Sequence, residues 1–255
     1  MMDMAGTVSI VTGSSSGVGA ATVRLLAARG SNIVVNYSKS QAAAEQVADE
    51  CRSLGVEALV CQADVSNDAD CCRLVEQALN RWGRLDVLVN NAGTTKFVNH
   101  ADFDDLDSDD FKDIYGVNVI GPFQMVRAAR EALTASGNAA VVNVASIAGV
   151  KGGGSSIAYA ASKGALMTMT MSLARVLGPE IRVNTVCPGF IEGDWLAAGM
   201  GQERYDKTRQ ALKSHAPLQT VCTPETVAES ILSFIESHSV VTGQHLVLDA
   251  GHLLM

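Results

Sequence analysis

Tyr159 and Lys163 are the residues of this chain whose types and spacing most clearly predict chemistry. Side chains four residues apart share one face of a helix, so the phenol and the ammonium can point into one site. An ammonium near a tyrosine favours the tyrosinate and lowers the phenol pKa from its usual value of about 10. Such a tyrosine can exchange a proton with a substrate oxygen. The competing interpretation of the pair alone is a tyrosine and a lysine on a solvated helix face.

Ser146 follows residues 140–144, an apolar run typical of a buried strand. At the carboxyl end of a parallel strand its hydroxyl would face a ligand crevice. There it could donate a hydrogen bond to a substrate oxygen as negative charge develops. Taken alone, the residue is better explained as a strand-end serine that bonds local backbone.

A glycine-rich segment, Thr12-Gly13-Ser14-Ser15-Ser16-Gly17-Val18-Gly19, lies between a predicted strand and a predicted helix. Glycines allow a tight turn and a close approach of the backbone to a pyrophosphate, whose charge the helix N-terminus favours. The spacing is not G-x-G-x-x-G, and no lysine follows the last glycine, which disfavours a P-loop ATPase. The segment therefore predicts a dinucleotide site.

Short apolar runs alternate with helical patterns along the whole chain. This alternation predicts an α/β fold, a Rossmann-type doubly wound parallel sheet flanked by helices in a single domain of residues 1–255. One stretch, 189–222, breaks the rhythm and is expected to be a loop-rich substrate lid. The predicted strands are 8–11, 33–35, 58–61, 85–89, 140–144, 182–186 and 245–248. The predicted helices are 18–28, 41–54, 68–82, 108–135 with a kink at Pro122, 159–177 and 223–236.

The order of these motifs resembles that of the short-chain dehydrogenase/reductase family over the full length of the chain. The glycine segment is followed by Asp64-Val65, by Asn90-Asn91-Ala92-Gly93, by the Tyr159/Lys163 pair and by Pro188-Gly189. The similarity is greatest to 3-oxoacyl-(acyl-carrier-protein) reductases. It implies an NAD(P)-dependent oxidoreductase that interconverts a carbonyl and a secondary alcohol, acting on a small-molecule or acyl-carrier-linked substrate.

The resemblance also implies roles for single residues. It reverses the preference for a structural Ser146 and adds Asn118, which would hold a water in a proton relay, to give the catalytic set Asn118, Ser146, Tyr159 and Lys163. Lys163 would also bond to the nicotinamide ribose. A homotetramer is implied, with residues 108–135 and 159–177 as its interfaces. The second of these helices carries an apolar exterior of Ala165, Met167, Met169 and Met171.

The residues after the second strand, Asn36-Tyr37-Ser38-Lys39, bear on the choice of cofactor. An acid at this point bonds the adenine ribose and repels a 2′-phosphate. Asn36 would remove that repulsion, while Ser38 and Lys39 could bind the phosphate. Ser16, by contrast, stands where many NADP-binding relatives carry a basic residue. We predict a preference for NADP(H) with measurable NAD(H) activity, which Asn36→Asp should reverse.

The predicted cofactor site comprises Gly13, Ser15, Ser16, Gly17, Val18, Gly19, Asn36, Ser38, Lys39, Asp64, Val65, Asn91, Ala92, Gly93, Tyr159, Lys163, Pro188, Gly189 and Ile191. One departure from the family pattern lies nearby, because Gly193 stands where a threonine that binds cofactor phosphate is common.

Composition and charge bear on the class of protein, its location and the presence of a metal site. A net charge of −8 argues against a nucleic-acid binder, and no apolar run is long enough to span a membrane. The acidic opening, Met1 to Met4, is unlike a secretory signal, so the cytosol is expected. The histidines and six cysteines show no metal-ligand spacing. A sugar or polyol dehydrogenase, a hydroxysteroid-type enzyme and a non-catalytic nucleotide-binding sensor or scaffold remain as alternatives.

Overall fold

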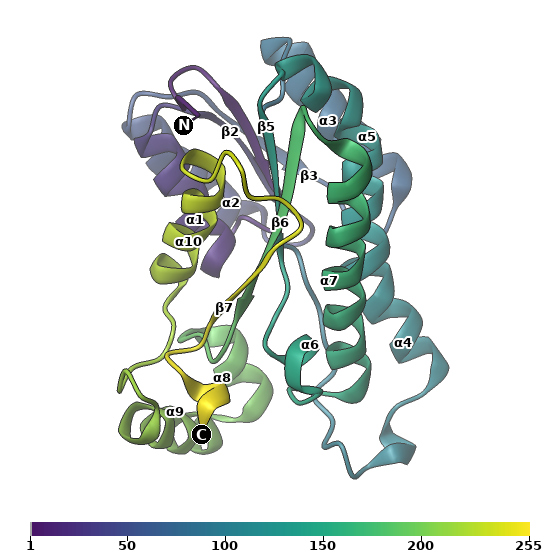
Figure 1. Cartoon of the computed structure of the whole chain (residues 1–255), viewed down its shortest axis with the longest axis vertical. Helices are drawn as coiled ribbons and strands as arrows, with labels where there is room; N and C mark the ends of the chain where they lie inside the picture. The colour runs from purple at the N-terminus through teal and green to yellow at the C-terminus, as the bar shows by residue number, and fades with distance from the viewer. Residues whose placement is uncertain (1) are drawn as a thin grey trace.

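A seven-stranded sheet runs through the computed structural model, which describes residues 2–255 (Figure 1). Every strand is parallel to its neighbours, in the order β3-β2-β1-β4-β5-β6-β7. The order reverses between β1 and β4, the point where a doubly wound sheet binds its ligands. The strands are β1 Val8–Val11, β2 Asn32–Tyr37, β3 Ala58–Gln62, β4 Val87–Asn90, β5 Ala139–Val144, β6 Ile181–Pro188 and β7 His245–Leu248.

Helices cover both faces of this sheet, as the predicted fold requires. In Figure 1, α1, α2 and α10 lie on one side, and α3, α4, α5 and α7 lie on the other. The first group is α1 Gly17–Ala28, α2 Gln41–Ser53 and α10 Pro224–Glu236; the second is α3 Asp68–Trp82, α4 Ser108–Tyr115, α5 Gly121–Ser136 and α7 Ile157–Leu177. No helix within residues 2–255 is long and apolar enough to cross a membrane.

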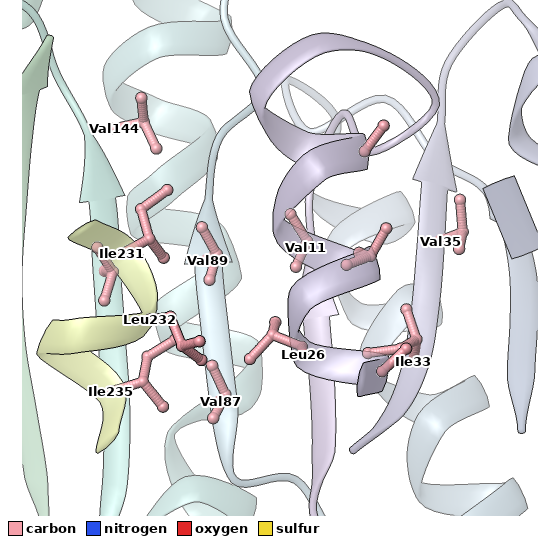
Figure 2. Packing of buried hydrophobic residues seen from close by; sticks show 14 of the residues in the cluster. Val11, Leu26, Ile33, Val35, Val87, Val89, Val144, Ile231, Leu232 and Ile235 are labelled. Carbon is pink, nitrogen blue, oxygen red and sulfur yellow. The ribbon is translucent and has the colours of Figure 1, made fainter. Parts of the chain in front are cut away.

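Side chains of the strands alternate between two cores because successive residues of a strand point to opposite faces. Figure 2 shows the core under α1 and α10, where Val87 and Val89 of β4 meet Leu26 of α1 and Ile231 of α10. Leu88, between the two valines, belongs to the opposite core under α3, α5 and α7. Both faces of the central strands are thereby buried, which explains their nearly continuous apolar sequence.

The predicted long helix 108–135 is a continuous helical run in the structure and contains a π-helical turn. It consists of α4, the π-helical turn η2 (Gly116–Ile120) and α5, with the irregularity just before the kink expected at Pro122. Pro122 lies in the first turn of α5 and cannot donate to the carbonyl four residues earlier, that of Asn118. The irregularity therefore precedes the proline, and it contains Asn118.

The stretch 189–222 was predicted to be loop-rich, and this was wrong in part. It contains α8 (Asp194–Met200) and α9 (Gln202–His215), which lie with α6 (Ala148–Lys151) toward one end of the molecule in Figure 1. Two short 3₁₀ turns, η1 (Phe103–Asp105) and η3 (His252–Leu254), complete the elements. Only Tyr205 and Leu212 of α9 are buried, so its sequence carries too few apolar residues for a helical period to be recognised.

Candidate active site

The glycine segment is held in place by the residues that follow β4. The Asn91 side chain donates to the carbonyls of Thr12 and Gly13 at 2.9 and 3.1 Å. The Thr12 hydroxyl accepts from the backbone amides of Asn91 and Ala92, both at 3.0 Å. A Cβ at Gly19 would lie 2.6 Å from the Asn91 amide nitrogen, so only glycine permits this contact. The segment that leads into α1 is thereby held against the residues that follow β4.

Asn36, at the end of β2, is hydrogen-bonded to the backbone around it, while its effect on the choice of cofactor stays a prediction. It is 2% exposed, and its Oδ1 accepts from the Gly13 amide at 2.9 Å. Its Nδ2 donates to the carbonyls of Ala63 at 3.1 Å and Cys61 at 3.3 Å. The side chain is committed to the backbone of the glycine segment and of β3, so an aspartate here would not simply restore an acid beside a ribose.

One cavity of about 1130 Å³ extends from the glycine segment to Tyr159. Of the predicted site residues, it brings together Gly13, Ser15, Ser16, Gly17, Val18, Asn36, Ser38, Lys39, Asp64, Val65, Asn91, Ala92, Gly93, Ser146, Tyr159, Lys163, Pro188, Gly189 and Ile191. Gly19 and Asn118 lie outside its wall, in supporting positions. Residues that follow each of the strands β1 to β6 line the cavity. This is expected at the point where the strand order of the sheet reverses.

The wall of this cavity suits a dinucleotide. Gly17 has a φ of +53° with open space around the position of a Cβ, and no side chain caps the first turn of α1. Backbone amides at a helix N-terminus are donors for phosphate. Lys163 is 4% exposed, and its ammonium makes one hydrogen bond, to the Val144 carbonyl at 2.8 Å. An ammonium has three donors, so Lys163 retains capacity for ribose hydroxyls.

Burial dominates the protonation of the catalytic pair. Desolvation raises the pKa of Tyr159 to about 12, and the Ser146 side chain acts in the opposite direction. Desolvation lowers the pKa of Lys163 to about 8. The Lys163 ammonium lies 5.6 Å from the centre of the Tyr159 ring. Desolvation is the largest influence on the phenol, so the pKa of Tyr159 lies above its usual value in the protein without cofactor. The lowering of this pKa expected from Lys163 stays a prediction.

Asn118 supports the site from behind the cavity wall. Its side chain is fully buried in η2, accepts from the Thr94 amide at 2.8 Å and donates to the Thr94 carbonyl at 2.9 Å. It also donates to the Ser162 hydroxyl at 3.0 Å, which in turn bonds to the Tyr159 carbonyl. π-Helical turns of this kind are frequent at functional sites. Asn118 therefore ties the segment after β4 to α7; its role in a water relay stays a prediction.

The substrate side of the cavity contains residues that the sequence did not single out. Phe97, Lys151, Arg204 and His252 line it together with Trp195 of the expected lid. Phe97 and Lys151 follow β4 and β5 in the chain, and loops at the carboxyl ends of strands form the site in this fold. That topological rule was the available signal for these two. Arg204 and His252 lie on α9 and η3, whose positions the sequence did not reveal.

Comparison with known proteins identifies the family. A family model described as enoyl-(acyl carrier protein) reductase matches residues 13–252. A protein named as ketoacyl reductase 2 of the granaticin polyketide synthase of Streptomyces violaceoruber is 43% identical over 97% of this chain and 96% of its own length. The chain belongs to the short-chain dehydrogenase/reductase family. It is accordingly an NAD(P)-using oxidoreductase, as members of this family are.

Other relatives agree on the family and differ in substrate. A 3-oxoacyl-[acyl-carrier-protein] reductase of Synechocystis is 31% identical over 97% of both chains. A solved structure described as a short-chain dehydrogenase/reductase from Burkholderia xenovorans has a TM-score of 0.91 at 39% identity, covering 98% of this chain and 99% of its own. An NAD⁺-bound xylitol dehydrogenase has a TM-score of 0.88 at 27% identity, covering 98% of this chain and 100% of its own.

Gly193 stands where a threonine is common in this family, and its backbone conformation favours glycine. Its φ is +146° and its ψ is 170°, a region that residues with a side chain rarely adopt. Its amide donates to the Tyr205 hydroxyl at 3.1 Å. A threonine at this position would have to change the backbone at the start of α8.

Metal and cysteine chemistry find no support in the described part of the chain. No group of three histidine, cysteine or acidic side chains within residues 2–255 could hold a metal ion. All six cysteines are free thiols. Burial raises the pKa of Cys187, beside Lys163, to about 11, so its thiolate is disfavoured.

Proposed function

We propose that the chain is an NADP(H)-preferring reductase that converts a carbonyl into a secondary alcohol, with Tyr159 as the proton donor. The observation that supports this best is the placement of Tyr159, Ser146 and Lys163 at one end of the cavity whose other end is the glycine segment. A protonated phenol is the form needed when a carbonyl is reduced. A non-catalytic sensor would have no use for this buried, charged group beside a phenol.

Each residue then has a definite task. A bound reduced nicotinamide supplies the hydride. The Ser146 hydroxyl donates a hydrogen bond to the carbonyl oxygen and so stabilises the negative charge that develops there. Tyr159 donates its phenolic proton to that oxygen. Lys163 holds the nicotinamide ribose with its free donors and places its positive charge near the resulting tyrosinate. The amides of Gly17 and Val18, at the N-terminus of α1, hold the pyrophosphate.

The preference for NADP(H) is proposed on Ser38 and Lys39. Both side chains are exposed and line the cavity beyond the end of β2. A hydroxyl and an ammonium can bind a 2′-phosphate, and a single exposed pair contributes about 1–2 kcal/mol. That corresponds to roughly 10- to 30-fold selectivity, so NAD(H) should still be used.

An acyl-carrier-linked 3-oxo substrate is the leading hypothesis for the physiological reaction. The relatives named as ketoacyl and 3-oxoacyl reductases support it. Lys151 and Arg204 also line the cavity, and neither forms an ion pair among residues 2–255. Free cations on the wall of the cavity suit the phosphate of a carrier arm. The xylitol dehydrogenase neighbour keeps a polyol as the second candidate, and a hydroxysteroid-type substrate stays as a third.

The deciding experiment is turnover by the Tyr159→Phe variant. We expect kcat to fall by about 10²- to 10⁴-fold, the usual contribution of a positioned acid, with cofactor affinity unchanged. Oxidation of NADPH and NADH should be followed by absorbance with 3-oxoacyl and 2-enoyl thioesters, xylulose and a steroid ketone. Tyr115→Phe, on α4, is the matched control. Wild-type turnover by Tyr159→Phe would refute the assignment.

We also propose a homotetramer that acts in the cytosol. Exposed apolar side chains lie on both predicted interfaces: Ile120 and Phe123 on the first, and Met171 and Val176 on the second. Met167 and Met169 were expected on this exterior, but they pack against Leu166 and Cys187 instead. Light scattering should give four times the chain mass at micromolar concentration. Six free thiols suit a reducing compartment.

A further inference from the structure

Three aromatic side chains lie in series along the substrate side of the cavity. The ring centres of Phe97 and Trp195 are 5.6 Å apart, and those of Trp195 and Tyr159 are 6.3 Å apart. The rings are tilted by 58° and 45°, within the range that aromatic contacts prefer. Trp195 therefore connects the proton donor to an aromatic surface that extends away from it.

The short helix α8 is held over Tyr159 by this aromatic series. Trp195 is in its first turn, and Gly199 is in its last. A Cβ added at Gly199 would overlap the Phe97 ring, so the ring occupies the space beside the backbone of α8. Phe97 thus contacts the first turn of α8 through Trp195 and the last turn through Gly199. These contacts fix the positions of both Phe97 and Trp195.

The surface formed in this way is apolar and uncovered. Trp195 is 51% exposed although it lines the cavity, and Leu196 and Met200 continue the wall on the same helix. The Ser155 hydroxyl, which also lines the cavity, is bonded to the Thr95 hydroxyl at 2.7 Å. A substrate hydroxyl placed against the faces of the aromatic rings would lose water there, because a ring face is a poor hydrogen-bond partner. A flat apolar ring would instead contact the ring faces and remove them from water.

We infer that the substrate is a ketone carried on a flat aromatic or alicyclic ring, and that Phe97 and Trp195 are its specificity-determining residues. This inference rests on the proposed carbonyl reduction at Tyr159. The carbonyl reaches Ser146 and Tyr159, and the rest of the ring system lies against Phe97 and Trp195. A linear polyol or a short acyclic 3-oxo ester leaves the same surface uncovered.

Steady-state kinetics test the preference. The bicyclic ketone α-tetralone should be reduced with at least a tenfold higher kcat/KM than xylulose or ethyl acetoacetate. Trp195→Ala should raise KM for α-tetralone about tenfold and should lower kcat/KM for ethyl acetoacetate by a clearly smaller factor. Trp195→Phe should keep the preference, and Phe97→Leu should weaken it. An equal loss on all three ketones in Trp195→Ala, or a wild-type preference for a linear substrate, would overturn the inference.

Fluorescence separates this inference from the proposed reaction. The chain has two tryptophans, and Trp82 lies on α3 outside the cavity. In Trp82→Phe, Trp195 is the single tryptophan, and α-tetralone should quench it with saturation while xylulose should not. Quenching without turnover of any ketone would refute the reaction and support the ring site. Turnover of ketones without quenching by α-tetralone would refute the ring site alone.

Discussion

The side-chain oxygen of Asn36 accepts a hydrogen bond from the backbone amide of Gly13 at 2.9 Å. The contact joins the end of β2 to the first glycine of the segment proposed to bind pyrophosphate. Two contacts of the Asn36 backbone reinforce the connection. The backbone amide of Asn36 donates to the Ser14 hydroxyl, and the backbone amide of Ser14 donates to the backbone carbonyl of Asn36, both at 2.9 Å. Asn36 is therefore a positioning residue for the glycine segment.

This position gives Asn36→Asp an outcome different from a simple change of cofactor. A carboxylate cannot donate, so the carbonyls of Cys61 and Ala63 would face a buried negative charge. We expect a loss of about 2–4 kcal/mol of stability and a fall in melting temperature of about 5–15 °C. Affinity for NADPH and NADH should fall together, with their ratio changed by less than about threefold, because the shared pyrophosphate site is displaced.

Thermal unfolding and fluorescence titration of both cofactors measure these effects. Ser38→Ala is the matched control, because Ser38 lies two residues away and is exposed. It should change the cofactor ratio without changing the melting temperature. A stable Asn36→Asp protein that prefers NADH would contradict the positioning role and restore the ribose interpretation.

Asn36 also shows where prediction from the sequence ends. The parallel sheet, the two-sided core and the shared cavity follow from apolar period and motif order, and the structure confirms them. The direction of a polar side chain at a strand end does not follow, because Asn36 can face a ligand or a neighbouring backbone with the same local sequence. The pKa of Tyr159 does not follow from the local sequence either, since desolvation depends on every segment around the cavity. Helices α8 and α9 were missed because they bury few side chains.

Lys39 should carry the discrimination that Asn36 does not. Removing its ammonium in Lys39→Ala should lower kcat/KM for NADPH by about 10- to 30-fold, because the 2′-phosphate loses an ion pair. The value for NADH should stay within about twofold. Lys112→Ala, an exposed lysine on α4, should leave both values unchanged. Equal losses for the two cofactors would show that Lys39 does not contact the 2′-phosphate.

The lowered pKa of Lys163, about 8, predicts how cofactor affinity depends on pH. Burial favours the neutral amine, so the ammonium is present below about pH 8 and is lost as the pH rises through that value. The dissociation constant for NADPH should rise about tenfold between about pH 7 and about pH 9.5, as charged hydrogen bonds to the ribose weaken. NADH should follow the same profile, because the nicotinamide ribose that Lys163 is proposed to bind is common to both cofactors. In Lys163→Met both cofactors should bind weakly at every pH in this range; a profile that persists in that variant would assign the titration to another group.

Gly193 provides a test of the backbone at the start of α8. Since its φ of +146° is accessible almost only to glycine, Gly193→Thr should cost about 1–3 kcal/mol and lower the melting temperature by several degrees. The strain should also displace Trp195, two residues away, and raise KM for the ketone substrate while the dissociation constant for cofactor changes less. Gly116→Ala is the control, because φ there is −50° and an added Cβ would meet only an ordinary contact at 3.6 Å. If Gly193→Thr proved as stable as the wild type with an unchanged KM, α8 would be free to adopt a second backbone conformation, and its placement over Tyr159 would not depend on glycine.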